Sequence, residues 1–135
     1  MTVLLDTSLL ISCFVDDIHS KKAIQMLHAI ITGEITAHVP AFVLVEFCGA
    51  LSRKVGTENA TLAFRQVQEW VETETLHPIS QTEQTYSIAQ TLALRYGIKG
   101  ADAIIAALSK QYNLQLATFD KELHEKLKSE MKFHI

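Results

Sequence analysis

Four acidic residues stand where apolar segments of the chain begin or end. They are Asp6, Glu46, Asp102 and Asp120. A charge inside an apolar run is costly unless something compensates it. Several such charges in one chain suggest a shared compensator, and clustered carboxylate oxygens suit Mg²⁺ or Mn²⁺. The pattern therefore predicts a metal site whose chemistry would be hydrolytic.

Each acid also has an ordinary structural explanation. Asp6, Asp102 and Asp120 each stand before a helix-like segment, where aspartate commonly caps the first turn. Glu46 would be an ordinary residue on a solvated helix face, but its apolar neighbours leave little polar surface there. Because the four acids occur together, their combination is more specific evidence for a metal site than any one of them alone.

Two further groups of side chains would serve such a site. The hydroxyl residues beside the acids are Thr7, Ser8 and Thr118. They either cap helices and fill strands or support the carboxylates by hydrogen bonds. The candidates for phosphate contacts are Arg53, Lys54, Arg95 and Lys99, although each is more simply a solvated residue at a helix end. The six histidines show no ligand spacing and receive no role.

Strand-like and helix-like segments alternate along the chain. Apolar runs predict strands over residues 2–6, 35–39, 76–79, 114–119 and 131–135. Helical spacing predicts helices over 9–15, 23–31, 41–54, 102–112 and 121–128, one after a Thr57 cap, and one from a Ser80–Glu83 capping box to Tyr96. This alternation predicts an α/β fold, a three-layer α/β/α sandwich with a mainly parallel central sheet.

Such a sheet also predicts where the acids meet. Sites in parallel sheets form beyond the carboxyl ends of the strands. Asp6 and Asp120 fall at two of those ends. Glu46 and Asp102 lie in, or at the start of, helices that would reach the same rim.

Composition restricts the class of protein. The 135 residues are 48% hydrophobic and 20% charged, which is typical of one globular domain over residues 1–135. Two cysteines in apolar surroundings fit a reducing cytoplasm. No apolar run is long enough to span a bilayer, and Asp6 interrupts the N-terminal one, so we expect neither a membrane anchor nor export. The net charge of −3 argues modestly against non-specific nucleic-acid binding unless a metal neutralises the acids.

The motifs around the four acids occur in a characteristic order. They are Leu4-Leu5-Asp6-Thr7-Ser8, Val39-Pro40 through Glu46, Asp102-Ala103-Ile104-Ile105-Ala106, and Thr118-Phe119-Asp120. Over essentially its whole length the chain resembles PIN domains, specifically the small VapC-type toxin nucleases. The resemblance implies a Mg²⁺- or Mn²⁺-dependent ribonuclease, often dimeric and often inhibited by an antitoxin, in which the four acids bind metal and catalyse. Some PIN nucleases carry further acids near the last motif, and here the nearest is Glu122.

Other readings of the same acids fit less well. A haloacid-dehalogenase-like phosphatase would need a second aspartate two residues after the first, where this chain has Ser8. A receiver-type module would need adjacent acids near the first strand end, but Asp16 and Asp17 lie well past it. A nucleotide-binding module would need a glycine-rich loop after a strand. The remaining alternative is a catalytically silent PIN-fold module that binds RNA or protein.

The helix-like segments also predict self-association. Apolar residues around 27–31 and 64–71 exceed what a small monomer readily hides, so we expect a homodimer.

Overall fold

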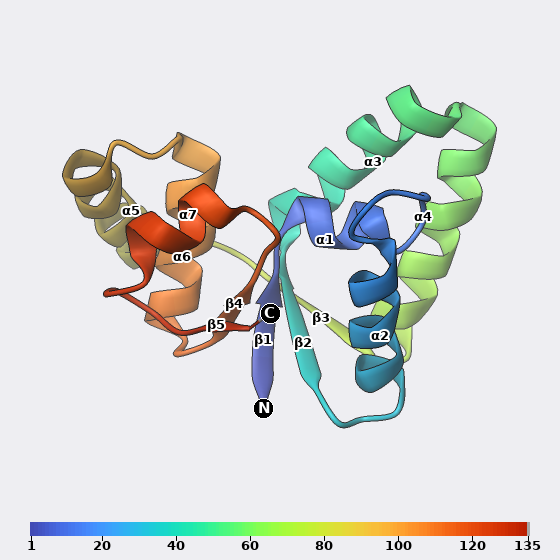
Figure 1. Cartoon of the computed structure of the whole chain (residues 1–135), viewed down its shortest axis with the longest axis horizontal. Coiled ribbons are helices and arrows are strands. Elements are labelled where there is room, and N and C mark those ends of the chain that lie inside the picture. Colours follow the sequence, from blue (N-terminus) through green and yellow to red (C-terminus); the bar gives the residue numbers. More distant parts are fainter. Residues whose placement is uncertain (135) are drawn as a thin grey trace.

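The computed structural model describes residues 1–134, which form five strands and seven helices (Figure 1). In chain order they are β1 (Thr2–Leu5), α1 (Thr7–Ser12), α2 (Ser20–Ile31), β2 (Thr36–Pro40), α3 (Ala41–Val55), α4 (Thr57–Glu72), β3 (Leu76–Ile79), α5 (Glu83–Tyr96), α6 (Gly100–Gln111), β4 (Gln115–Ala117), α7 (Lys121–Leu127) and β5 (Phe133–His134).

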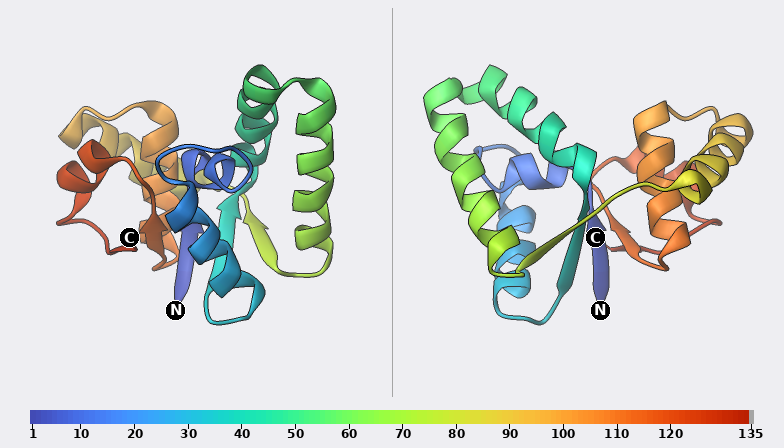
Figure 2. Two further views of the ribbon diagram at one scale, coloured as in Figure 1. Left: turned by 45° about the vertical axis from the view of Figure 1, so that its right-hand side comes forward. Right: turned by 180° about the vertical axis from the view of Figure 1, so that it is seen from behind.

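The five strands form one sheet in the order β3-β2-β1-β4-β5, and every pair is parallel. The chain first moves from β1 to β2 and β3, and later returns past β1 to β4 and β5. Figure 1 shows α1–α4 on one side of β1 and α5–α7 on the other. From behind, Figure 2 shows the connection from β3 to α5 crossing between these two groups. The expected three-layer α/β/α arrangement is confirmed, and the strand order reverses between β1 and β4.

Apolar side chains on both faces of the sheet form the core. Leu4 in β1 and its neighbour Leu116 in β4 have no exposed surface, which is usual for central parallel strands. Phe47 in α3 and Leu108 in α6 are equally buried. Burying one such side chain contributes about 1.5–3 kcal/mol, so this packing holds the helices firmly against the sheet.

Three of the expected helix starts are wrong. The capping box of α5 pairs Thr82 with Thr85, two residues beyond the expected Ser80–Glu83 pair. Thr57 is the first residue of α4 and not its cap, because Gly56 at φ 87° separates α3 from α4. Helix α6 begins at Gly100, so Asp102 lies within its first turn instead of capping it.

Two strands and one helix also differ from the expected ranges. β4 ends at Ala117 because Thr118 and Asp120 turn the chain into α7. β5 covers only Phe133–His134 of the expected 131–135, and Ile135 lies outside the described residues. α1 begins at Thr7, two residues early, because Asp6 caps it. Among residues 1–134, every helix is too short or too polar to cross a membrane.

Candidate active site

Asp6 lies between the end of β1 and the start of α1. Its Oδ1 accepts hydrogen bonds from the backbone N–H of Leu9 at 3.0 Å and the hydroxyl of Ser8 at 2.9 Å. The hydroxyl of Thr118 donates to Oδ2 across 112 residues of sequence. The side chain is thus both a helix cap and a buried, immobilised carboxylate, since the residue is only 8% exposed. The capping explanation and the site explanation are compatible.

Glu46 reaches the same region from the second turn of α3. Its neighbours Val43 and Phe47 are fully buried, which turns Glu46 to the surface at the helix edge. The hydroxyl of Thr7 donates to Glu46 Oε1 at 2.9 Å, joining α1 to α3. One short segment after β1 therefore positions two of the four carboxylates.

Asp120 and Asp102 approach from the other group of helices. Asp120 caps α7, with its Oδ1 accepting from the N–H of Leu123 at 3.0 Å. Its own N–H donates to the Thr118 hydroxyl at 3.1 Å, so Thr118 links Asp120 to Asp6. Asp102 is half-buried in the first turn of α6.

All four acids line one open pocket of about 370 Å³ at the carboxyl ends of β1 and β4. They come from segments as far apart as residues 6 and 120, and hydrophobic packing brings them together despite their like charge. The pocket lies where the strand order reverses, the usual position of sites in open parallel sheets. Its lining also includes Thr7 and Ser8, whose hydroxyls bond to the acids.

The carboxylates disturb one another's protonation. Burial raises the pKa of Asp6, against hydrogen bonds from Thr118, Leu9 and Ser8 that lower it, and the charge of Asp102 raises it further. Burial also raises the pKa of Asp102, and repulsion by Asp120 and Glu46 adds to this effect, while Lys99 opposes it. The charges of all four acids are therefore coupled through Asp102.

Comparison with models of protein families identifies the family to which this architecture belongs. The model of the PIN domain matches residues 3–128. This chain belongs to the PIN-domain family. PIN domains are generally nucleases, so the acidic pocket lies in a fold whose members mostly hydrolyse nucleic acids. A search of curated protein sequences finds no significant match.

Solved structures of other PIN proteins share the fold at low identity. VapBC2 from Rickettsia felis, bound to a promoter DNA fragment, has a TM-score of 0.73 at 16% identity, covering 99% of this chain and 98% of that one. FitAcB from Neisseria gonorrhoeae has a TM-score of 0.69 at 20% identity, with 99% and 97% covered. A toxin–antitoxin complex from Klebsiella pneumoniae has 0.66 at 20% identity, with 90% and 89% covered.

The donor set of this PIN domain fits a hard divalent cation. Carboxylate oxygens are the ligands that Mg²⁺ and Mn²⁺ prefer, and a cation would offset the repulsion by Asp120 and Glu46 that adds to the effect of burial on the pKa of Asp102. As the side chains stand, however, no three His, Cys, Asp or Glu residues within 1–134 are close enough to enclose an ion. Binding would require the carboxylates to move together. Glu46 and Asp120 are exposed enough to do so.

The expected phosphate-binding residues fall in different places. Only Lys99 lines a cavity with the acids, a neighbouring pocket of about 210 Å³ that shares Asp102 and Asp120 with the first. Arg53 and Lys54 are exposed at the end of α3, outside both pockets. These assignments stay predictions, with Lys99 the best placed.

Arg95 is engaged elsewhere in the PIN fold. Its guanidinium donates to Glu130 at 2.8 Å. Glu130 also accepts from Lys110 Nζ at 2.6 Å and from the Tyr96 hydroxyl at 2.7 Å. Hydrogen bonds from Lys110, Tyr96 and Arg95 lower the pKa of Glu130 to about 2, so this carboxylate stays charged and holds Arg95. Glu130 therefore fastens both α5, through Arg95 and Tyr96, and α6, through Lys110, to the chain before β5.

The structure adds pocket residues that the sequence did not indicate. His19 and Phe119 line the pocket together with the acids, and their rings stack at 4.4 Å with an interplanar angle of 5°. Lys126 lines the neighbouring pocket and pairs with Glu122 at 3.3 Å. No local spacing pattern marked His19 or Lys126, and Phe119 was indicated only as the middle residue of the Thr118–Asp120 motif, because these residues belong to loops and helices that meet only in the folded chain.

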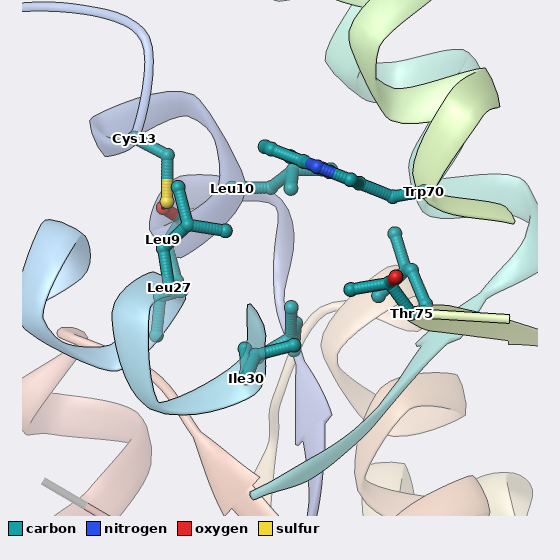
Figure 3. A pocket seen from close by; sticks show the side chains of 9 residues that line it. Leu9, Leu10, Cys13, Leu27, Ile30, Trp70 and Thr75 are labelled. Atoms are coloured by element: carbon teal, nitrogen blue, oxygen red, sulfur yellow. The ribbon is translucent and has the colours of Figure 1, made fainter. Parts of the chain in front are cut away.

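A second cavity between α1, α2, α4 and β3 has no comparable chemistry. Figure 3 shows the apolar side chains of Leu9, Leu10, Leu27 and Ile30 around it, with Trp70 and Cys13 at its edges. Its interior of about 10 Å³ holds at most about one water molecule. Burial raises the pKa of the Cys13 thiol to about 12, which leaves it protonated and a poor nucleophile.

Proposed function

We propose that this chain is a Mg²⁺- or Mn²⁺-dependent endoribonuclease and the toxin of a type II toxin–antitoxin pair. The observation that supports this proposal best is the convergence of Asp6, Glu46, Asp102 and Asp120 on one open pocket of a PIN domain. Isolated helix caps would have no reason to share a pocket, because bringing their charges together costs free energy. A cation and a phosphodiester substrate would explain that cost.

The acids and hydroxyl residues each have their own role in the proposed reaction. Asp6, which is buried and held by hydrogen bonds, and Asp102 would be the main ligands of the metal ion. Glu46 and Asp120 would bind the ion directly or through water, and one of them would orient the attacking water. Thr7, Ser8 and Thr118 hold the carboxylates of Glu46 and Asp6 in place. A bound divalent ion supplies an activated water and neutralises charge on the phosphate oxygens.

Metal-dependent cleavage is the direct test. Purified protein should cut single-stranded RNA in Mg²⁺ or Mn²⁺ and stop when EDTA is added, as followed by gel electrophoresis of an end-labelled oligonucleotide. Restoring excess Mn²⁺ should restore cleavage. Cleavage that continues in EDTA would refute metal dependence, and RNA binding without any cleavage would favour the catalytically silent module.

The toxin assignment adds a protein partner in the cytoplasm. Three proteins with this fold were solved as VapBC2, FitAcB and a toxin–antitoxin complex, which supports an antitoxin partner here. An antitoxin segment laid across the pocket would offer an arginine to the carboxylates, a strong charge-assisted pairing. A small overlapping upstream reading frame that encodes a DNA-binding protein would support this pairing over a role in RNA processing.

A homodimer is the other proposed assembly. The surface that supports it only partly matches the expected ranges 27–31 and 64–71, because Ile30 is 6% exposed and Val67 is fully buried, whereas Ile31 is 56% exposed. Ile24 on α2 and Leu62 on α4, which lie outside those ranges, are also more than half exposed. Light scattering should report a dimer at micromolar concentration, since apolar surface of this kind commonly marks contacts.

A charge in this surface should break the dimer. Ile31→Glu should shift the protein to a monomer, while Leu94→Glu is the matched control on α5, where Leu94 is 88% exposed. A monomeric wild-type protein, or equal effects of both substitutions, would refute the interface on α2 and α4.

A further inference from the structure

His19 and Phe119 form an aromatic pair on the wall of the acidic pocket. Their rings are nearly parallel, with centroids 4.4 Å apart, and both border the same cavity as the four acids. Phe119 lies in the chain directly between Thr118, which bonds to Asp6, and the pocket residue Asp120. The stacked rings are therefore next to the place where a phosphodiester would be cut.

The loop that carries His19 is built to hold it there. Asp17 Oδ1 accepts the backbone N–H of His19 at 2.8 Å, and Asp17 Oδ2 accepts the buried hydroxyl of Ser12 at 2.9 Å. The hydroxyl of Ser20 receives the N–H of Asp17 at 2.7 Å and donates to the carbonyl of Val15 at 2.6 Å. These bonds tie the loop to α1 and α2. The loop is therefore already ordered, and a ligand would lose little free energy in fixing it.

The adjoining pocket has a different chemistry. The neighbouring pocket shares Asp102 and Asp120 and adds the amines of Lys99 and Lys126. An RNA strand that crosses the shared carboxylates would thus pass from the aromatic rings of one pocket to the amines of the other. Proteins that hold single-stranded nucleic acid commonly combine these two surfaces, with bases stacked on aromatic rings and the backbone along cations.

We propose that His19, stacked on Phe119, is a platform for one unpaired base of the RNA next to the bond that is cut, with Lys99 and Lys126 contacting the backbone in the neighbouring pocket. This inference rests on the proposed ribonuclease function. It requires the target to be single-stranded at the site, because a paired base inside a duplex would leave no ring face free to stack. His19 is then a positioning residue and takes no part in proton transfer.

The experiment measures binding without cleavage. In an Asp6→Asn background with Mg²⁺, we would titrate a single-stranded RNA carrying one 2-aminopurine, whose fluorescence falls on stacking, with the label moved along the strand. His19→Ala should raise Kd roughly 5- to 100-fold, the usual effect of removing a stacking ring, and should abolish the quenching at one label position. His19→Phe should restore both. His28→Ala is the control, because His28 is exposed on α2 away from the pocket.

The outcomes separate the two proposals. If otherwise wild-type protein cuts RNA but His19→Ala binds and quenches normally, the platform is refuted and the ribonuclease stands. If His19→Phe fails as His19→Ala does while both melt like wild type, the imidazole matters and stacking is refuted. If the protein neither binds nor cuts RNA, both proposals fail.

Discussion

Asp6→Asn is expected to reduce metal-dependent RNA cleavage by well over about a hundredfold, since losing even an outer-shell partner of a ligand typically costs 10–100-fold. Asp6 is the most enclosed of the four acids and the one with the most hydrogen bonds. Replacing one carboxylate oxygen by an amide nitrogen removes a metal-binding atom and a negative charge. The amide nitrogen cannot coordinate a hard cation.

The fold should survive this substitution. Asparagine caps helices about as well as aspartate, so its oxygen still accepts from the N–H of Leu9 and the hydroxyl of Ser8. Its NH₂ group donates to the hydroxyl of Thr118, which has a free lone pair. Circular dichroism and thermal melting should match wild type, or show slightly higher stability because a buried charge has gone.

Asp16→Asn is the matched control for this experiment. Asp16 is exposed in the loop after α1 and does not line the pocket, yet the change in charge is identical. It should leave cleavage within about twofold of wild type, as is usual for surface changes with little effect on free energy. If Asp6→Asn retains a tenth or more of the activity, Asp6 is only a cap.

The second large effect concerns Asp102 and the binding of metal. Mn²⁺ should raise the melting temperature of wild-type protein, because an ion that binds only the folded state stabilises it by mass action, by about 2.7 kcal/mol at a hundred times Kd. The melting temperature of Asp102→Asn should rise much less on addition of Mn²⁺, since the substitution removes a metal ligand. Thermal melts of both proteins, with and without Mn²⁺, make the comparison, and equal metal shifts would exclude Asp102 from the site.

Without metal, Asp102→Asn should be at least as stable as wild type. The difference in their free energies of unfolding should depend on pH. The pKa of Asp102 is raised in the folded state from its ordinary value of 3.8, so ionising it favours the unfolded chain. Below about pH 4 this penalty is absent, and it develops as the pH rises through the folded-state pKa. In EDTA, Asp102→Asn should therefore match wild type in acid and become the more stable protein toward neutral pH. A constant difference at all pH values would refute this coupling.

Local sequence determined much of this protein. Apolar runs placed all five strands, and glycine and capping signals placed most helix ends to within two or three residues, because these features depend on neighbours in the chain. The order of the four acidic motifs indicated the PIN family, and the family match over residues 3–128 confirms it. The exact starts of α4 and α6 were missed because neither helix begins with a capping side chain, and that of α5 because Ser80–Glu83 and Thr82–Thr85 are both suited to a capping box.

Only the tertiary structure decided how the site is assembled. The bond between Thr118 and Asp6 spans 112 residues, and the stacking of His19 on Phe119 joins two loops that share no sequence pattern. The tertiary structure also places Arg95 away from the four acids, because Arg95 pairs with Glu130. Periodicity reports which face of an element is buried, whereas the strand order and the packing of the helices determine which distant side chains meet. In this fold both depend on β1 lying at the centre of the sheet, where the strand order reverses beside β4 and the carboxylates of four separate segments converge.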